Sequence, residues 1–146
     1  MGIRYLYLVR HGQRAPEAPG DGPLESGITP AGVEQARLVA DRLASLPVTT
    51  IYCSPLRRAA ETAGILAERH PAARLVVLPA LAECIPVMPR FYVAESIWIS
   101  PADYARMKRR ADTVYARLFK SARGTDRHEL VVSHGNLLRY LLLRAL

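Results

Sequence analysis

Five side chains whose chemistry suits phosphate are spread along the sequence. Arg10 and His11 stand near its start, Arg58 lies in the middle, and Glu83 and His134 come later. A guanidinium group presents a planar fork that matches phosphate oxygens, and a neutral imidazole can attack phosphorus. A carboxylic acid can protonate the leaving oxygen. These residue types can therefore cleave a phosphate ester if the fold brings them together.

The elements that must position these side chains are short strands alternating with helices. Apolar, β-branched runs that end in polar or glycine-containing turns predict strands at 3–9, 49–53, 75–78 and 129–133. Thr-Pro and Ser-Pro pairs predict helix starts at 29–30, 54–55 and 100–101, and an apolar run predicts a last helix at 137–146. This alternation predicts an α/β fold, a three-layer α/β/α sandwich around a mostly parallel central sheet.

The candidate residues all follow the ends of predicted strands. Arg10 and His11 follow the first strand, and Arg58 lies in the first turn of the helix after the second. Glu83 follows the third strand and His134 the fourth. Ligands of open α/β sheets bind beyond the carboxyl ends of the strands. We therefore predict one site in which two imidazoles and two guanidinium groups bind a phosphate dianion, with Glu83 as the best-placed acid.

Two other carboxylates are rivals to Glu83 for the role of the acid. Glu17 lies in the loop after the first strand, and Glu61 lies within a predicted helix. An ion pair with Arg57 or Arg58 on the same helix is the simpler account of Glu61. We therefore prefer Glu83.

Several neighbours of the candidate site have two open interpretations. Gln13 and Arg14 either line the rim of the pocket or are merely solvated. The side chains of Phe91, Tyr92, Ile97 and Trp98 either form a wall for the substrate or pack over the core.

No metal ion or cofactor is predicted. The two arginines and the second histidine supply the positive charge that Mg²⁺ supplies in kinases. The four histidines also lack the short spacings of a zinc site. Of these, His70 and His128 have no partner motif and are expected at the surface.

The composition indicates a single globular domain. The chain has 146 residues, of which 50% are hydrophobic and 23% are charged. This balance is too apolar for disorder and too interrupted by charge for a membrane span. We predict one domain over residues 1–146, with an irregular excursion at 84–100 where no periodicity is visible.

The charge and the cysteines indicate the partners and the compartment. The net charge is +7, from 20 Lys and Arg against 13 Asp and Glu, which favours anionic partners. The basic run at 108–110 is expected on the solvent side of its helix, and neither nucleic acid nor a membrane is predicted as a partner. Cys53 and Cys84 are expected to be free, buried thiols. With no signal peptide expected before Ile3, the predicted location is cytoplasmic.

Four blocks of the sequence resemble the histidine phosphatase superfamily, also called the phosphoglycerate mutase-like family. They are LVRHGQR at 8–14, SPLRRAAETA at 54–63, LAE at 81–83 and VSHGN at 132–136. They occur in the family's order and span nearly the whole chain. ITPAGVEQARLVADRLASL, the IWISP at 97–101 and NLLRYLLLRAL at the end are similar to the branch of the mitochondrial phosphoglycerate mutase-like serine/threonine protein phosphatase.

The resemblance implies a phosphoglycerate mutase-like fold and a metal-independent phosphatase that works through a phosphohistidine. By the same resemblance His11 looks like the histidine that accepts the phosphoryl group, and His134 like the second histidine of the pocket. Arg10 and Arg58 look like the phosphate clamps, and Glu83 looks like the proton donor.

The chain departs from the family pattern in three places. The family's common RHGET, with an Asn a few residues on, is RHGQR here, so a side-chain amide that often touches phosphate is either missing or replaced by Gln13. Cys84 takes a place where glycine is common. The chain also stops within the helix that follows His134, where relatives continue, so that the fold is expected to be short at the C-terminus.

The expected substrate is a phosphoprotein or another bulky phosphomonoester, because the excursion at 84–100 is too short to form a deep cap over a small sugar phosphate. A small-molecule phosphatase for sugar or nucleotide phosphates and a phosphoglycerate mutase are the alternatives within the family. A non-catalytic phosphate-binding module is the alternative outside catalysis. The apolar last helix also makes a homo-oligomer through that helix an option.

Overall fold

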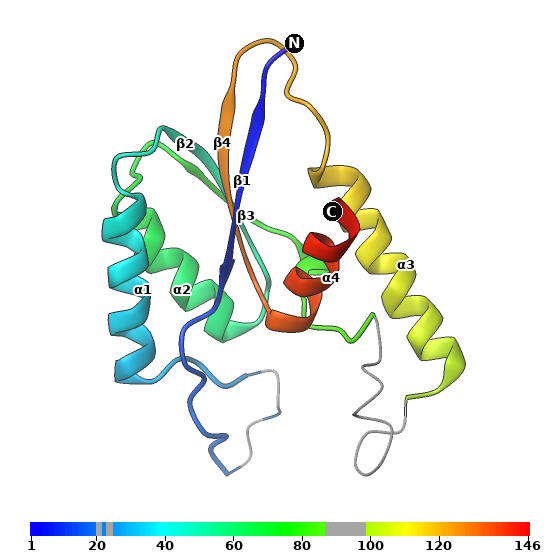
Figure 1. Cartoon of the computed structure of the whole chain (residues 1–146). Helices are drawn as coiled ribbons and strands as arrows, with labels where there is room; N and C mark the ends of the chain where they lie inside the picture. The colour runs from blue at the N-terminus through cyan, green and yellow to red at the C-terminus, as the bar shows by residue number, and fades with distance from the viewer. Residues whose placement is uncertain (20–21, 23–24, 87–98) are drawn as a thin grey trace.

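Strands and helices alternate along the chain, as the sequence predicts (Figure 1). The computed structural model describes residues 1–19, 22, 25–86 and 99–146. Its elements are β1 (Arg4–Arg10), α1 (Pro30–Leu43), β2 (Val48–Cys53), α2 (Arg57–Glu68), β3 (Arg74–Val77), the short 3₁₀ helix η1 (Pro79–Leu81), α3 (Pro101–Leu118), β4 (Arg127–Ser133) and α4 (Gly135–Ala145). Of the predicted excursion at 84–100, residues 87–98 lie outside the described residues, and so do Phe91, Tyr92, Ile97 and Trp98.

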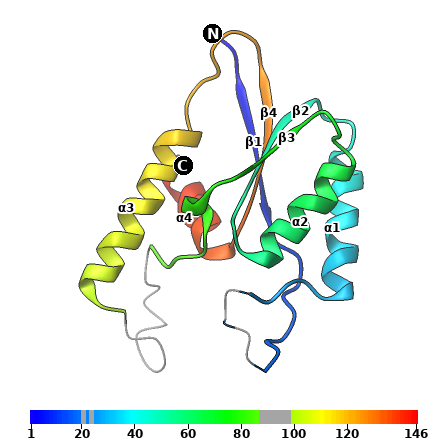
Figure 2. The same ribbon diagram turned by 180° about the vertical axis from the view of Figure 1, so that it is seen from behind.

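The four strands form one parallel sheet in the order β1-β4-β2-β3. Helices α1 and α2 cover one face of the sheet, and α3 and α4 cover the other (Figures 1 and 2). The side chains of β4 alternate between the two cores: Val131 packs with α3 and α4, whereas Leu130 and Val132 pack with α2. This arrangement confirms the predicted three-layer α/β/α sandwich.

Two helices begin with the predicted side-chain caps. The Thr29 hydroxyl accepts the N–H of Gly32 at 3.0 Å, and the Ser100 hydroxyl accepts the N–H of Asp103 at 3.0 Å. Each cap satisfies one of the backbone N–H groups that a helix leaves without a partner in its first turn.

The predicted starts of the other two helices are each wrong by two residues. Helix α2 begins at Arg57 without a side-chain cap, because the Ser54 hydroxyl accepts the N–H of Leu56 and contacts His134 instead. Helix α4 begins at Gly135 rather than at Leu137, so the predicted turn is already its first turn.

Several polar residues are more buried than the sequence indicates. His70, which is expected at the surface, is only 6% exposed at the end of α2. His128 is half-buried, where it bonds to the Tyr7 hydroxyl at 2.9 Å and stacks on Tyr5. Glu129 is 1% exposed and forms an ion pair with Arg4. Hydrophobic periodicity reports which side of an element is apolar, but it does not report these partners from distant parts of the chain.

Cys53 and Cys84 are buried free thiols, as predicted.

Strand β1 lies at one edge of the sheet. The C-terminal end of the chain exposes Leu142 and Leu143 of α4 and Leu146 directly after it. Among the described residues, no helix is both long and apolar enough to cross a membrane.

Candidate active site

A pocket of about 510 Å³ lies at the carboxyl ends of the parallel strands. Eight residues line it: Arg10, His11, Gly12, Gln13, Arg14, Gln35, Arg58 and Glu83. Six of these residues were predicted from the sequence as site or rim residues, and the fold brings them to one place. The predicted site residue His134 does not line this pocket, because its side chain is fully buried.

The turn after β1 is held tightly against α1 and α2. The N–H of His11 donates to the carbonyl of Ser133 at 3.0 Å, which extends the pairing with β4 by one residue. The N–H of Gly12 donates to the hydroxyl of Thr62 at 3.1 Å. A Cβ atom at Gly12 would lie 2.4 Å from the carbonyl oxygen of Gly32, so only glycine allows this close approach.

The ring of His11 is held by a hydrogen bond through its Nδ1 atom. Its Nδ1 lies 2.7 Å from the carbonyl oxygen of Gly12. A carbonyl can only accept a hydrogen bond, so Nδ1 carries the proton and the lone pair resides on Nε2. Burial lowers the pKa of His11, and the positive charges of Arg58, Arg10 and Arg14 lower it further, against the effect of the Gly12 bond. His11 is therefore neutral at pH 7, as a nucleophile requires.

His134 lies beside His11 and behind the pocket. The two ring centroids are 5.1 Å apart, and Nε2 of His134 lies 2.8 Å from the Ser54 hydroxyl. Burial, followed by the nearby charge of Arg58, lowers the pKa of His134 to about 3. The Ser54 hydroxyl also accepts the N–H of Leu56. Nδ1 of His134 has no hydrogen-bond partner within the described parts of the chain.

The two predicted phosphate clamps approach the pocket from different elements. Arg58, in the first turn of α2, is only 6% exposed, and burial lowers its pKa. Arg10 is exposed at the end of β1, with its guanidinium group beside the start of α4: a Cβ at Gly135 would lie 3.6 Å from Arg10 Nε. Helix N-termini favour anions, so the same spot offers both backbone and side-chain positive charge.

Glu83 has the environment of a proton donor. Burial raises its pKa, against the opposing effects of N–H groups from Cys84 and Leu137 and of the charges on Arg58 and Arg10. The N–H of Cys84 donates to Glu83 Oε1 at 3.0 Å. A raised pKa keeps the carboxyl protonated to a higher pH than usual, which suits a general acid.

Arg110 holds the Glu83 loop, a role that sequence reasoning missed. Its guanidinium group donates to the carbonyl oxygens of Ala82 and Glu83, both at 2.9 Å. The prediction that the whole run 108–110 is solvated is therefore wrong for Arg110, which is half-buried, although Lys108 and Arg109 are exposed. Helical periodicity predicts on which side of the helix Arg110 lies, but it does not predict that the loop of Glu83 packs against that side.

Gln13 and Arg14 lie on the rim of the pocket. The Thr29 hydroxyl donates to the side-chain oxygen of Gln13 at 2.7 Å. Arg14 Nε donates to the Ser26 hydroxyl at 2.6 Å. Gln35 joins the rim as a residue that sequence reasoning missed, and its side-chain oxygen accepts the N–H of Gln13 at 2.8 Å. Its place in the second turn after the Thr29 cap is the one signal that could have found it.

The rival carboxylates are used elsewhere. Glu61 accepts from Arg57 Nε at 2.7 Å and from the N–H of Ile28 at 2.8 Å, so it ties α2 to the loop before α1. Glu17 forms an ion pair with Arg14. Across the described ranges, the His, Cys, Asp and Glu side chains form no cluster of three or more that could hold a metal ion.

Comparison with known proteins identifies sequence and structural relatives. The sequence model of the histidine phosphatase superfamily (branch 1) matches residues 6–85. The mouse protein named serine/threonine-protein phosphatase PGAM5, mitochondrial, is 34% identical over 98% of this chain and 50% of its own length. The chain thus spans about half the length of the curated relatives that it matches over nearly its full extent.

Solved structures share the fold. A phosphoglycerate mutase from Plasmodium falciparum has a TM-score of 0.68 at 28% identity, over all of this chain and 70% of its own. A putative α-ribazole-5′-P phosphatase from Escherichia coli has a TM-score of 0.75 at 23% identity, over 98% of this chain and 79% of its own.

The cytoplasmic location predicted from the sequence is contradicted by these relatives. The mouse protein and its human counterpart, which is 34% identical, are both named as mitochondrial. The prediction depended on a strand pattern that begins at Ile3, and such a pattern carries no information about the compartment in which a fold works.

Proposed function

Because the chain belongs to the histidine phosphatase superfamily, we propose that it hydrolyses phosphomonoesters through a phosphoryl group carried transiently on His11. One observation carries this proposal. The hydrogen bond from His11 Nδ1 to the Gly12 carbonyl leaves the lone pair of the ring on Nε2. His11 lies in a pocket that Arg10, Arg58 and Glu83 also line.

Substrate binding would use the positive groups around His11. The phosphate dianion lies between the guanidinium groups of Arg10 and Arg58. Both groups donate charge-assisted hydrogen bonds to its oxygens. In the proposed complex, the Ser54 hydroxyl donates its proton to Nε2 of His134, and the Nδ1–H of His134 donates to one phosphate oxygen from behind the pocket. The support is that this buried Nδ1 has no partner in the described structure. These groups also hold the charge that develops on the phosphoryl oxygens during transfer, so no metal ion is needed.

The first chemical step transfers the phosphoryl group to the enzyme. The Nε2 lone pair of His11 forms a bond to phosphorus while the bond from phosphorus to the ester oxygen breaks. The electron pair of the broken bond stays on the leaving oxygen, and Glu83 delivers its proton there. The alcohol then departs, leaving phospho-His11 and the Glu83 carboxylate.

The second step regenerates the enzyme. A water molecule attacks the phosphorus of phospho-His11, and Glu83 accepts the proton that the water loses. The bond from Nε2 to phosphorus breaks, its electron pair returns to the imidazole, and inorganic phosphate leaves. Both residues end in the protonation states from which they began.

A phosphorylated serine or threonine of a protein is the proposed substrate. Its support is the name of the relatives that match nearly the whole chain, which are serine/threonine-protein phosphatases. The phosphoglycerate mutase fold of a 28% identical structure supports a small phosphorylated acid as the second candidate. Turnover of a panel of phosphopeptides and 3-phosphoglycerate separates the two, and a strong preference for 3-phosphoglycerate would reject the protein substrate.

Hydrolysis of p-nitrophenyl phosphate tests the proposed chemistry. We expect His11→Ala to lower kcat/KM by at least ~10³-fold, because the covalent path is lost. The control is His128→Gln, which removes a histidine near the start of β4, away from the pocket, and should keep most of the activity. Undiminished turnover by a folded His11→Ala protein would refute the proposal, and vanadate binding without any turnover in the wild type would assign the chain as a phosphate-binding module.

A further inference from the structure

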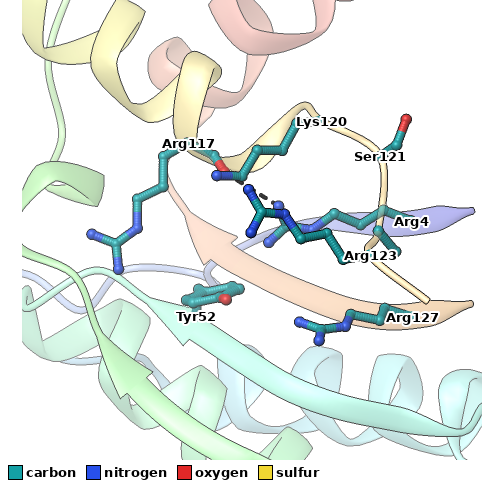
Figure 3. A pocket seen from close by; sticks show the side chains of 8 residues that line it. Arg4, Tyr52, Arg117, Lys120, Ser121, Arg123 and Arg127 are labelled. Atoms are coloured by element: carbon teal, nitrogen blue, oxygen red, sulfur yellow. Dashed lines mark hydrogen bonds between the residues drawn. The ribbon is translucent and has the colours of Figure 1, made fainter. Parts of the chain in front are cut away.

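A second pocket lies at the opposite edge of the sheet. It has a volume of about 320 Å³ and is lined by Arg4, Tyr52, Arg117, Lys120, Ser121, Ala122, Arg123 and Arg127 (Figure 3). We call it the basic pocket. Arg4 and Arg127 are the first residues of β1 and β4, which run parallel for seven residues each. At 3.3 Å per residue, these two residues are roughly 20 Å from the carboxyl ends of the same strands, where the first pocket lies.

One of the five cations in the basic pocket is part of the framework. Arg4 forms an ion pair with the buried Glu129, and it donates to the carbonyl oxygen of Arg117 at 3.2 Å. These bonds tie the start of β1 to β4 and to the end of α3. The guanidinium group of Arg4 is thus a fixed wall of the pocket, with its charge already balanced by Glu129.

The other four cations lack a counter-charge. Arg117, Lys120, Arg123 and Arg127 form no ion pair within the described residues, and no acidic side chain lines the pocket. Two cations earlier on α3 differ in this respect: Arg106 pairs with Asp103, and Lys108 pairs with Asp112 at 3.0 Å.

The unbalanced cations come from separate segments. Arg117 lies in the last turn of α3, Lys120 and Arg123 lie in the connection to β4, and Arg127 begins β4. In the view of Figure 3, the ring of Tyr52 lies between the side chains of Arg117 and Arg127, and those of Lys120 and Arg123 lie above it. A concave surface lined by one sign of charge concentrates the electrostatic potential and raises the local concentration of anions.

We propose that the basic pocket binds a soluble anion that carries two or more phosphate groups. A single phosphate dianion would balance only part of the charge of four cations, whereas a diphosphate or triphosphate balances most of it. Arginine side chains bind phosphate oxygens in a planar fork, and three of the four cations are arginines. The volume lies at the small end of the range for small-molecule pockets.

The shape of the basic pocket distinguishes this ligand from other polyanions. Tyr52 is the one aromatic residue in its lining, so it has no row of rings on which successive nucleic-acid bases could stack. The cations surround a hollow rather than project from an extended face, which suits a compact anion better than a lipid surface. This proposal stands independently of the catalytic pocket and of the chemistry at His11.

Calorimetric titration with sodium tripolyphosphate tests the proposal. The titration is run without vanadate and again with vanadate, which occupies the catalytic pocket. We expect wild-type protein to bind one tripolyphosphate per chain, and Arg117→Gln/Arg123→Gln to bind it at least ~10-fold more weakly, because charge-assisted hydrogen bonds are lost. The charge-matched control is Arg37→Gln/Arg109→Gln, which removes two exposed arginines outside the pocket and should bind like the wild type.

Four outcomes would overturn the proposal. These are no tripolyphosphate binding by the wild type, equal weakening in the two double variants, loss of binding when vanadate is added, and binding only to vesicles of phosphatidylcholine with phosphatidic acid. Hydrolysis of p-nitrophenyl phosphate by Arg117→Gln/Arg123→Gln should match the wild type, which shows that the variant is folded and that its defect is confined to the basic pocket.

Discussion

Glu83 gains its character as an acid from its surroundings rather than from its own side chain. Burial raises its pKa, while neighbouring N–H groups and arginines pull the pKa back down. The pKa of Glu83 therefore depends on how deeply the loop after η1 is buried. Arg110 holds this loop in place through its hydrogen bonds to the carbonyl oxygens of Ala82 and Glu83. Arg110 is therefore a positioning residue for the proposed proton donor.

We predict that Arg110→Met weakens catalysis in the same pattern as Glu83→Gln. Alkyl phosphates need a proton on the leaving oxygen, so Glu83→Gln should lower their turnover by about 10²-fold or more and that of p-nitrophenyl phosphate much less. Arg110→Met should lower alkyl phosphate turnover by about 10-fold with the same contrast. The measurement is kcat/KM for both esters over a range of pH.

The control for this prediction is Arg109→Met, which alters the exposed neighbour on the same helix and should leave both rates unchanged. Equal losses with both esters in Arg110→Met would contradict the positioning role and indicate general damage to the pocket. No loss in Glu83→Gln would contradict the assignment of the acid itself.

At the level of elements, the catalytic turn depends on a close contact between two glycines. The turn at Gly12 and Gln13 rests against the first turn of α1. A Cβ at Gly32 would lie 2.6 Å from the carbonyl oxygen and 2.9 Å from the nitrogen of Gln13. Helix α1 therefore supports the turn that carries His11, the proposed nucleophile.

We predict opposite effects for alanine at two helical glycines. Gly32→Ala should lower the free energy of unfolding by about 1–3 kcal/mol and reduce activity, since it pushes the catalytic turn away. Gly64→Ala should raise the free energy of unfolding by about 0.5–1 kcal/mol, because its Cβ meets nothing within 4 Å and alanine favours a helix. Urea unfolding of both variants checks this, and a stabilised, fully active Gly32→Ala would contradict the support role.

The order and type of the elements could be predicted from sequence, but some boundaries could not. Apolar runs and Thr-Pro or Ser-Pro pairs report local preference, and they correctly place the strands and the starts of α1 and α3. The start of α2 depends on Ser54, whose hydroxyl bonds to His134, a residue 80 positions away. Such long-range partners are invisible in a local pattern, which is also why Arg110 and Gln35 were missed.

The sequence predicts which residues gather at the candidate site, but it does not predict how deeply each side chain is buried there. The rule that ligands bind beyond the carboxyl ends of parallel strands correctly gathered Arg10, His11, Arg58 and Glu83 into one pocket. The rule does not say which side chains reach the pocket and which lie behind it. His134 is buried against Ser54 because β4 lies in the interior of the sheet, and only the strand order reveals that.

At the scale of the whole molecule, the positive charge has two centres. Arg10, Arg14 and Arg58 lie at the catalytic edge, and the basic pocket lies at the other edge of the same sheet. Within the described residues, part of the net charge of +7 is thus concentrated in two pockets, and we propose that each binds an anion. The exposed leucines at the end of α4 remain the surface through which we expect any homo-oligomer to form.

The histidines predict how stability depends on pH. Burial lowers the pKa of His11 and His70, and burial with nearby positive charge lowers the pKa of His134 from 6.5 to about 3. Well above pH 6.5 these histidines are neutral in both the folded and the unfolded chain, so their full contribution to stability is present. As the pH falls below that value, the unfolded chain binds protons that the folded histidines do not. The raised pKa of Glu83 has the opposite effect on stability, because the folded chain binds this proton more readily than the unfolded chain does. Three histidines outweigh this single carboxyl group.

We therefore predict that the free energy of unfolding falls as the pH drops from about 6.5 toward 5, by up to about 1.4 kcal/mol per pH unit for each proton bound. His134→Gln should make this dependence shallower, because one of the three histidines is gone. Urea unfolding at several pH values measures both slopes. Identical slopes in the wild type and His134→Gln would contradict the burial of a neutral His134.

The phosphorylated intermediate is the most direct test of the catalytic account. The wild-type protein is mixed briefly with a phosphomonoester, quenched in base and digested, and the phosphorylated peptide is identified by mass spectrometry. We predict a phosphoryl group on His11 that is stable in base, is lost in acid and is absent from His11→Ala. Rapid turnover with no phosphoenzyme at His11, or an acid-stable phosphoryl group on another residue, would contradict the account.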